Sequence, residues 1–220
     1  FSKDDRQVQF EHQGIDLWCD LAVYYQKENK IQAYGNVFFQ QGDSIKMNSE
    51  YVEYDGTTKI ALAKEKVVLR NNSMTLNTEE LEFDRNKQEA FYDNFGTVKD
   101  SANVLTSDKG RYYMEIDKYE FKSDVKITNP DYVINSARMD YYTNTKNAYM
   151  YGPSTVVGED YKMYCERGFY NTVAETGYGV KNTRIDYSDR IIYGDSLYFN
   201  KATEFASATN NIKVIDTVND

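Results

Sequence analysis

Residues 49–77 read SEYVEYDGTTKIALAKEKVVLRNNSMTLN, and this stretch decides the fold. The aromatic Tyr54 stands directly before a turn-forming run, Asp55-Gly56-Thr57-Thr58. Apolar residues then alternate with other residues as far as a second turn, Asn71-Asn72-Ser73. Alternation with a period of two, bounded by turns, is typical of β-strands in a hairpin. The stretch therefore predicts two antiparallel strands within 29 residues.

The same pattern returns along the chain, and three columns of apolar residues follow a spacing of 29. The first column is aromatic throughout, although only 15% of the residues are aromatic: Tyr25, Tyr54, Phe83, Tyr112, Tyr141, Tyr170 and Phe199. The second is Leu69, Val98, Ile127, Val156, Ile185 and Val214, and the third is Met47, Leu76, Leu105, Ile134, Met163 and Ile192. The spacing predicts a repeat protein with one domain over 20–220, after a lead-in at 1–19. Its units are 20–48, 49–77, 78–106, 107–135, 136–164, 165–193 and 194–220.

The first strand of each unit changes its apolar parity midway. Met74 and Leu76 lie on one parity, whereas Leu81 and Phe83 lie on the other. A one-residue slip turns every side chain to the opposite face, so a bulge or corner is expected between the two pairs. Bent strands of roughly 11–13 residues, longer than the usual strand, then form two facing sheets with an apolar seam. The predicted fold is all-β, an elongated antiparallel β-jellyroll.

A parallel β-helix is the alternative fold, because its coils can have a similar length. It would suit a carbohydrate-binding or adhesive protein, or a structural repeat protein without a lipid ligand. The tight Asp-Gly and Asn-containing turns favour antiparallel pairing instead.

Composition excludes several functions. The net charge of −9 makes nucleic acid a poor partner, because phosphate binding needs clustered Lys and Arg. His12 is the only histidine, so a histidine-based triad or zinc site is not expected. Carboxylates recur at turn positions such as Asp55 and Asp84, where Asp makes Asx-turns. We therefore predict no catalytic residue, no metal, no cofactor and no enzymatic activity.

Several motifs in register resemble the periplasmic lipopolysaccharide-transport family of OstA-like, or LptA-type, β-jellyroll domains. They are Ala33-Tyr34-Gly35-Asn36-Val37, Gly42-Asp43-Ser44, Tyr54-Asp55-Gly56-Thr57-Thr58-Lys59, Leu76-Asn77-Thr78, Leu81-Glu82-Phe83-Asp84 and Gly152-Pro153. The resemblance is best over 14–157. Cys19-Asp20 and the richness in Tyr and Asn are similar to members from Bacteroidetes-type bacteria.

The resemblance implies a periplasmic protein, secreted across the inner membrane by a signal peptide that is not in this chain. It implies binding of lipopolysaccharide acyl chains in a hydrophobic groove, and their passage toward the outer membrane. It also implies end-to-end strand pairing with other jellyroll transport proteins or with further copies of the chain.

The predicted lipid-binding residues come from the three columns: Tyr54, Leu69, Leu76, Phe83, Val98, Leu105, Tyr112, Ile127, Ile134, Tyr141, Val156 and Ile185. A core filled by its own side chains is the alternative interpretation of these columns. Small residues at the apolar parity favour an unfilled interior: Ala61, Ala63, Ala90, Ala148, Gly152, Gly177, Gly179, Ala206 and Ala208.

Overall fold

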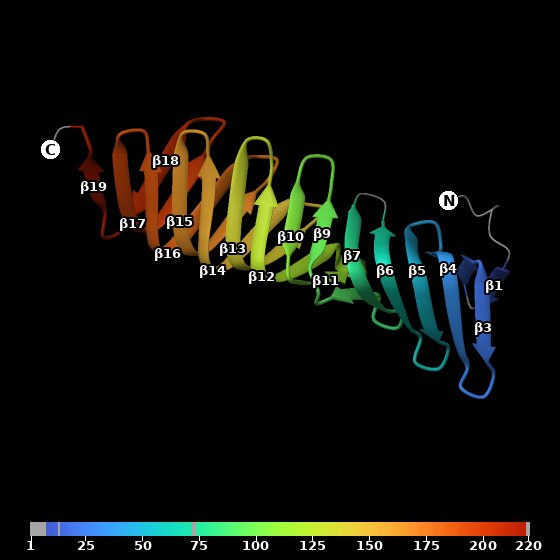
Figure 1. Ribbon diagram of the computed structural model, residues 1–220. Coiled ribbons are helices and arrows are strands. Elements are labelled where there is room, and N and C mark those ends of the chain that lie inside the picture. Colours follow the sequence, from blue (N-terminus) through green and yellow to red (C-terminus); the bar gives the residue numbers. More distant parts are fainter. Residues whose placement is uncertain (1–7, 13, 72–73, 219–220) are drawn as a thin grey trace. The chain divides into compact units, whose positions relative to one another are not determined.

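The computed structural model describes residues 8–12, 14–71 and 74–218 (Figure 1). Their secondary structure is β-strand apart from one short 3-10 helix, η2 (Met114–Ile116). The registered strand pairs are all antiparallel. The predicted antiparallel all-β fold is confirmed, and the parallel β-helix is excluded.

The strands belong to two compact units. Unit 1 holds the described residues up to Ser101, together with Lys109–Glu115. Its strands are β1 (Val8–His12), β2 (Ile15–Cys19), β3 (Leu21–Tyr25), β4 (Lys30–Gln41), β5 (Ile45–Asp55), β6 (Ile60–Arg70), β7 (Thr75–Asp84), β8 (Glu89–Tyr92), β9 (Gly96–Lys99) and β11 (Lys109–Tyr113). The described part of the predicted lead-in thus forms β1 and β2.

Unit 2 holds Ala102–Asp108 and the described residues from Ile116 onward. Its strands are β10 (Val104–Ser107), β12 (Lys118–Thr128), β13 (Tyr132–Tyr142), β14 (Asn147–Gly158), β15 (Tyr161–Asn171), β16 (Thr176–Tyr187), β17 (Arg190–Asn200), β18 (Phe205–Thr209) and β19 (Lys213–Asp216). Strands β12 to β17 lie side by side in sequence order (Figure 1).

The long strands bend where the sequence predicts a corner. In β7 the buried parity changes between Thr78 and Leu81, which confirms the corner in the first strand of a hairpin. The second strand, β6, keeps one buried parity but contains two left-handed residues, Glu65 (φ 64) and Lys66 (φ 53). The β6–β7 register shifts at this point, so the extra backbone of the bulge lies in the second strand.

Asx-turns join the strands, as the sequence predicts. Asp55 Oδ1 accepts hydrogen bonds from the backbone N–H groups of Thr57 (2.8 Å) and Thr58 (2.9 Å). Asp84 Oδ1 likewise accepts hydrogen bonds from the backbone N–H groups of Asn86 (2.9 Å) and Lys87 (3.1 Å). The residue that closes each turn has a positive φ, and these residues are spaced by 29: Lys59, Gln88, Asp117, Lys146, Glu175 and Glu204.

The turns also bond to one another. The carbonyl of Lys59 accepts from the N–H of Arg85 (3.1 Å) in unit 1, and that of Lys146 from Thr172 (2.9 Å) in unit 2. Each turn therefore supports the next one within its unit.

These turns predict a pH dependence of stability. The pKa of Asp55 is lowered mainly by its backbone hydrogen bond from Thr58, and the pKa of Asp84 mainly by Lys87. A carboxyl with a lowered pKa stabilises the fold above its unfolded pKa of about 3.9, and this contribution is lost as the pH falls through the folded pKa. The double variant Asp55→Asn/Asp84→Asn keeps acceptors for the turn bonds but cannot titrate. Urea unfolding should therefore show a smaller loss of stability between about pH 5 and pH 3 than in the wild type. Identical pH profiles would contradict the assignment.

One buried row of each unit alternates aromatic and small side chains, and it is called the aromatic row below. In unit 1 the directly paired residues are Tyr54, Ala61, Phe83, Ala90 and Tyr112. In unit 2 the alternation runs Tyr141, Ala148, Tyr170, Gly177, Phe199 and the exposed Ala206, and it is preceded by a second buried aromatic, Tyr119, paired with Tyr141. A Cβ on Gly177 would lie 3.0 Å from the rings of both Tyr170 and Phe199. Where the small residues of this row are buried, they make room for aromatic rings, so at these positions the expectation of an unfilled interior is wrong.

A second buried row, called the aliphatic row, contains both remaining columns in alternation. In unit 1 it runs Leu17, Phe39, Met47, Leu69, Leu76 and Val98. In unit 2 it runs Leu105, Ile127, Ile134, Val156, Met163, Ile185, Ile192 and Val214. The two rows meet in the core, because the Phe39 and Phe83 rings lie 5.9 Å apart between centroids.

Tyr25 departs from the aromatic column. It lies in β3, which pairs only with β4 among the described strands, and 40% of its surface is exposed. An edge strand has no second neighbour to cover its side chains, so the column enters the core only at Tyr54.

Candidate functional site: an apolar pocket of unit 2

In unit 2 the side chains of the aliphatic and aromatic rows become more exposed to solvent toward the last strands. In the aliphatic row Val156 is 0% exposed, Ile185 6% and Val214 57%. In the aromatic row Tyr170 is 0% exposed and Phe199 8%. A pocket of about 690 Å³ lies here, in the size range of about 300–1,000 Å³ that is usual for small-molecule sites.

Apolar and aromatic side chains from six strands, β13 to β18, line the pocket. Met163 of β15, Ile185 of β16 and Ile192 of β17 come from the aliphatic row, and Phe199 of β17 comes from the aromatic row. Tyr132 of β13 adds a further ring. Alternation turns every second residue of a strand inward, and the change of parity within β17 brings both Ile192 and Phe199 to the inner face. The pocket is therefore a continuation of the buried core that nothing fills.

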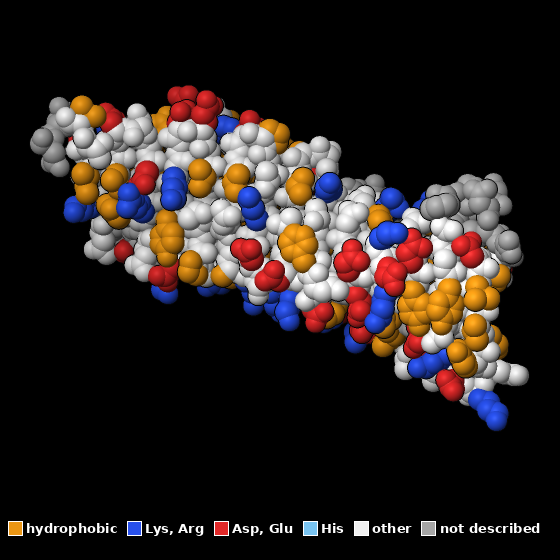
Figure 2. All heavy atoms as spheres, viewed as in Figure 1, with side chains coloured by type: hydrophobic (Ala, Val, Ile, Leu, Met, Phe, Trp, Pro, Cys, Tyr) orange, Lys and Arg blue, Asp and Glu red, His pale blue; other side chains and the backbone are white. Residues whose placement is uncertain are grey.

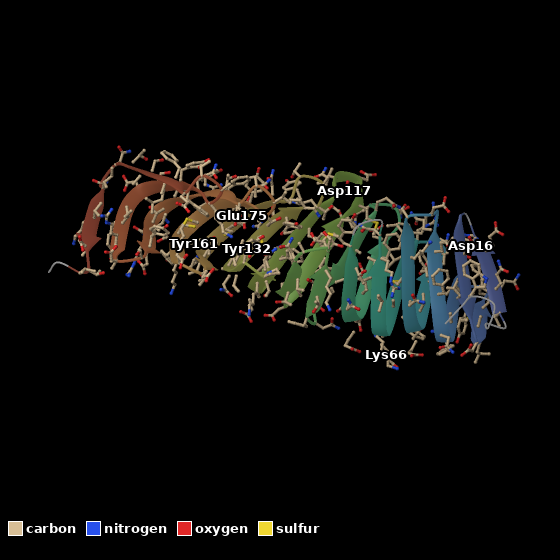
Figure 3. The ribbon with its side chains drawn as sticks, turned by 90° about the horizontal axis from the view of Figure 1, so that it is seen from above. Asp16, Lys66, Asp117, Tyr132, Tyr161 and Glu175 are labelled. Carbon is tan, nitrogen blue, oxygen red and sulfur yellow. The ribbon has the colours of Figure 1, made fainter. Side chains whose placement is uncertain are left out.

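Tyr132 and Tyr161 line the pocket, and both are labelled in Figure 3. The ring centroids of Tyr132 and Tyr170 lie 5.0 Å apart, and Tyr161 packs on Phe199 at 5.6 Å. Tyr132 Oη donates toward Asn103 Oδ1 (3.2 Å) and the Thr172 carbonyl (3.3 Å). These contacts fix the Tyr132 ring at the wall of the pocket.

The tyrosine hydroxyls stay protonated. Burial raises the pKa of Tyr132, Tyr161 and Tyr170 above the usual value of about 10. The hydroxyls of Tyr161 and Tyr170 make no well-formed hydrogen bond, although each changes the pKa of the other. A neutral, mainly apolar wall of this kind suits a hydrocarbon rather than an ion.

The rim of the pocket is mainly acidic. One cation, Lys201, lines the pocket and pairs with Glu175 (3.0 Å). Four lining residues are acidic: Asp131, Glu159, Asp160 and Glu204. Anionic groups gain little at such a rim, so the arrangement favours the apolar part of an amphiphile.

The twelve predicted lipid-binding residues are all buried, with exposures of 0–6%. Ile185 alone among them lines this pocket. The other eleven lie packed in the two rows: Tyr54, Leu69, Leu76, Phe83, Val98, Leu105, Tyr112, Ile127, Ile134, Tyr141 and Val156. Their role in lipid binding remains a prediction.

Sequence reasoning missed Tyr132 and Tyr161. A signal for them exists, because Asn103, Tyr132 and Tyr161 are also spaced by 29, and Tyr132 bonds to Asn103. Met163, Ile192 and Phe199 stood in the columns but were not among the twelve. Within the described residues no three His, Cys, Asp or Glu side chains are grouped to hold a metal ion. No helix found there has the length and apolarity needed to cross a bilayer.

Antiparallel strands around an apolar interior that opens into a pocket define an all-β protein with a candidate binding site. The chain belongs to the OstA-like protein family, whose model matches residues 3–137. The predicted resemblance is thereby confirmed. Members of this family are non-enzymatic transport proteins, so the prediction that the chain is not an enzyme is confirmed as well.

A solved structure is also similar to the chain. It is the crystal structure of LptH, the LptA homologous periplasmic component of the conserved lipopolysaccharide transport device from Pseudomonas aeruginosa. The two share 14% sequence identity with a TM-score of 0.27, and the match covers 60% of this chain and 77% of that one. No curated protein matches the chain.

Proposed function

We propose that this protein binds the acyl chains of lipopolysaccharide and passes them across the periplasm toward the outer membrane. The carrying observation is the pocket of unit 2, where the aliphatic and aromatic rows come to the surface. Each methylene that leaves water for such a surface contributes about 0.8 kcal/mol. An acyl chain would enter beside Ile185 and Ile192, and the family membership supports a transport role.

The remaining predicted lipid contacts form the second part of the proposal. Since Ile127 and Val156 are packed in the aliphatic row, an acyl chain reaches them only if the two rows separate. We also propose that a 29-residue jellyroll repeat over 20–220 is the architecture in which the two rows can separate. The regular spacing of the positive-φ turn residues supports it.

A photo-crosslinking residue tests the acyl-chain site. Placed at Ile192, which lines the pocket, it should capture lipopolysaccharide in cells that make both this variant and lipopolysaccharide. The matched control is Tyr193, the next residue of β17, which points to the opposite face. Capture at Tyr193 but not at Ile192 would contradict the proposal. A second probe at Val156 reports whether the rows separate.

End-to-end pairing is the proposed mode of assembly, with other jellyroll transport proteins or with copies of the chain. Strand β3 carries exposed apolar residues at one edge of unit 1: Leu21, Val23, Tyr24 and Tyr25. Figure 2 shows hydrophobic side chains gathered over β3 to β5 on the face that it displays. In unit 2, Phe205 of β18 and Val214 of β19 are also exposed. An edge with unpaired backbone groups recruits another strand.

Light scattering measures this assembly. Oligomers should grow with concentration and shrink when residues 195–220 are removed, because the deletion removes β18, β19 and the second half of β17. The circular dichroism of the truncated chain verifies that its strands persist. A monomer at every concentration would contradict end-to-end pairing. The rival function, a structural or adhesive repeat without a lipid, predicts assembly but no lipid capture at Ile192.

A further inference from the structure

The outer face of unit 2 carries a row of aromatic side chains, called the outer row below. Directly paired residues of β14 to β17 form it: Tyr149, Phe169, Tyr178 and Tyr198. The Tyr149 and Phe169 centroids lie 5.2 Å apart, and those of Phe169 and Tyr178 lie 5.3 Å apart. Tyr178 is 41% exposed and Tyr198 38%. With strands about 4.8 Å apart, four rings extend over about 14 Å.

The sheet itself does not require this row. The residues 87 positions earlier, three times 29, are Leu62, Glu82, Phe91 and Arg111 of unit 1. They form the corresponding cross-strand row, and there charged and apolar side chains alternate. Because that arrangement stabilises a sheet of the same kind, four consecutive aromatics, two half-buried and two exposed, need another explanation.

A polar row borders the outer row on one side, and a row of charged, aromatic and apolar side chains borders it on the other. On one side the paired residues are amides and a hydroxyl: Asn147, Asn171, Thr176 and Asn200. Asn171 Nδ2 donates to Asn147 Oδ1 (2.8 Å), which orients both amides. On the other side, the guanidinium groups of Arg138 and Arg167 lie 5.2 and 5.8 Å from the centre of the Tyr151 ring.

The end of the outer row is closed by carboxylates. Asp140 is paired with Tyr149, and Glu120 with Asp140. Asp140 contacts Lys118 (3.4 Å), and Glu120 contacts Lys122 (2.6 Å). The surface thus combines flat rings with both donors and acceptors of hydrogen bonds.

We propose that the outer row binds a saccharide chain. The C–H groups on the faces of a sugar ring carry a slight positive charge, and they stack on the negative faces of aromatic rings. Sugar hydroxyls both donate and accept, and they match amides, guanidinium groups and carboxylates in one narrow strip. This site lies on the outer face of the sheet and does not depend on acyl chains entering the pocket.

Other occupants fit this surface less well. A stable protein interface buries at least about 1,000 Å² with good complementarity, whereas the outer row is one residue wide and has a polar row along one side. Single-stranded nucleic acid also stacks on aromatic rows, but it needs a positively charged groove. Glu120 and Asp140 at the row, in a chain of net charge −9, oppose its phosphates.

Calorimetric titration of the full chain tests the proposal with two soluble probes. Maltoheptaose is a neutral saccharide, and deacylated lipopolysaccharide is a saccharide with phosphate groups and no acyl chain. At least one should bind the wild type, and Phe169→Thr/Tyr178→Thr should weaken that binding at least tenfold. Threonine keeps the preference for strand structure while removing the rings. Preference for the second probe alone would identify an anionic saccharide as the ligand.

The matched control is Tyr34→Thr/Tyr51→Thr, which removes two directly paired aromatic rings from β4 and β5 of unit 1. It should bind as the wild type does, and thermal melting compares the folding of the two double variants. The proposal is overturned if the wild type binds neither probe, or if both double variants lose binding equally. Tighter binding of single-stranded DNA at the same row would also overturn it. Neither probe carries an acyl chain, so failure here is distinct from failure of the pocket.

Discussion

Replacing Phe83 with alanine should lower the free energy of unfolding by about 3–5 kcal/mol, which is the usual cost of removing a buried aromatic ring. Phe83 is 1% exposed, stands between Ala61 and Ala90 in the aromatic row, and meets Phe39 edge-on. Neither alanine can fill the space that the ring leaves. Urea unfolding followed by far-ultraviolet circular dichroism measures the loss.

A swap within the row provides the control for this prediction. Ala61→Phe alone inserts a ring between Tyr54 and Phe83 and should destabilise by about 1–3 kcal/mol through overpacking. The double variant Ala61→Phe/Phe83→Ala keeps the total volume and exchanges the two positions. It should be more stable than the sum of the single effects predicts. Strict additivity would mean that the alternation of large and small side chains does not organise the row.

Much of this core could be predicted from the sequence. The period of 29 found the aromatic column, and the change of parity between Leu76 and Leu81 located the corner. These signals are local, because burial imposes a period of two on each strand. The left-handed pair at Glu65 and Lys66 could not be predicted in the same way. Neither residue type prefers a positive φ, so the bulge is imposed by the pairing of whole strands.

The filling of the interior was predicted incorrectly at the buried small residues, although Ala206 does line the open pocket. Alanine and glycine at inward positions suggested empty volume, but whether a small residue leaves a space depends on the residue opposite. Ala148 is paired with both Tyr141 and Tyr170, and these rings occupy the space. Register between strands is a property of the fold, so one strand's sequence does not reveal it. For the same reason the two aliphatic columns looked separate, although they form one row.

The pocket follows from where the two rows end. Inside unit 2 each strand covers its neighbours, whereas beyond β17 the short strands β18 and β19 bring small or exposed residues. Ala206 and Val214 continue the rows without closing them. The columns therefore predicted the apolar surface correctly, but they could not indicate which part of it is open to a ligand.

The proposed acyl-chain site predicts a large loss of affinity for one polar substitution. Ile192→Glu should weaken the binding of a fluorescent long-chain fatty acid at least tenfold. The carboxylate would lose water when an acyl chain covers it, and a buried charge without a partner is unfavourable. Ile192 is partly exposed in the absence of a ligand, so the folded protein should tolerate the substitution. Fluorescence titration gives the affinity, and displacement by lipopolysaccharide relates it to the proposed cargo.

Ile191→Glu is the matched control, since it places the same charge on the next residue of β17. Ile191 pairs with Asp186 and points to the face opposite Ile192. Its variant should bind the fatty acid with the affinity of the wild type. If Ile191→Glu and Ile192→Glu weaken binding equally, the acyl chain does not lie in the pocket. Unchanged affinity in both variants, with the wild type binding, would place the lipid elsewhere on the protein and remove the basis of the proposed transport path.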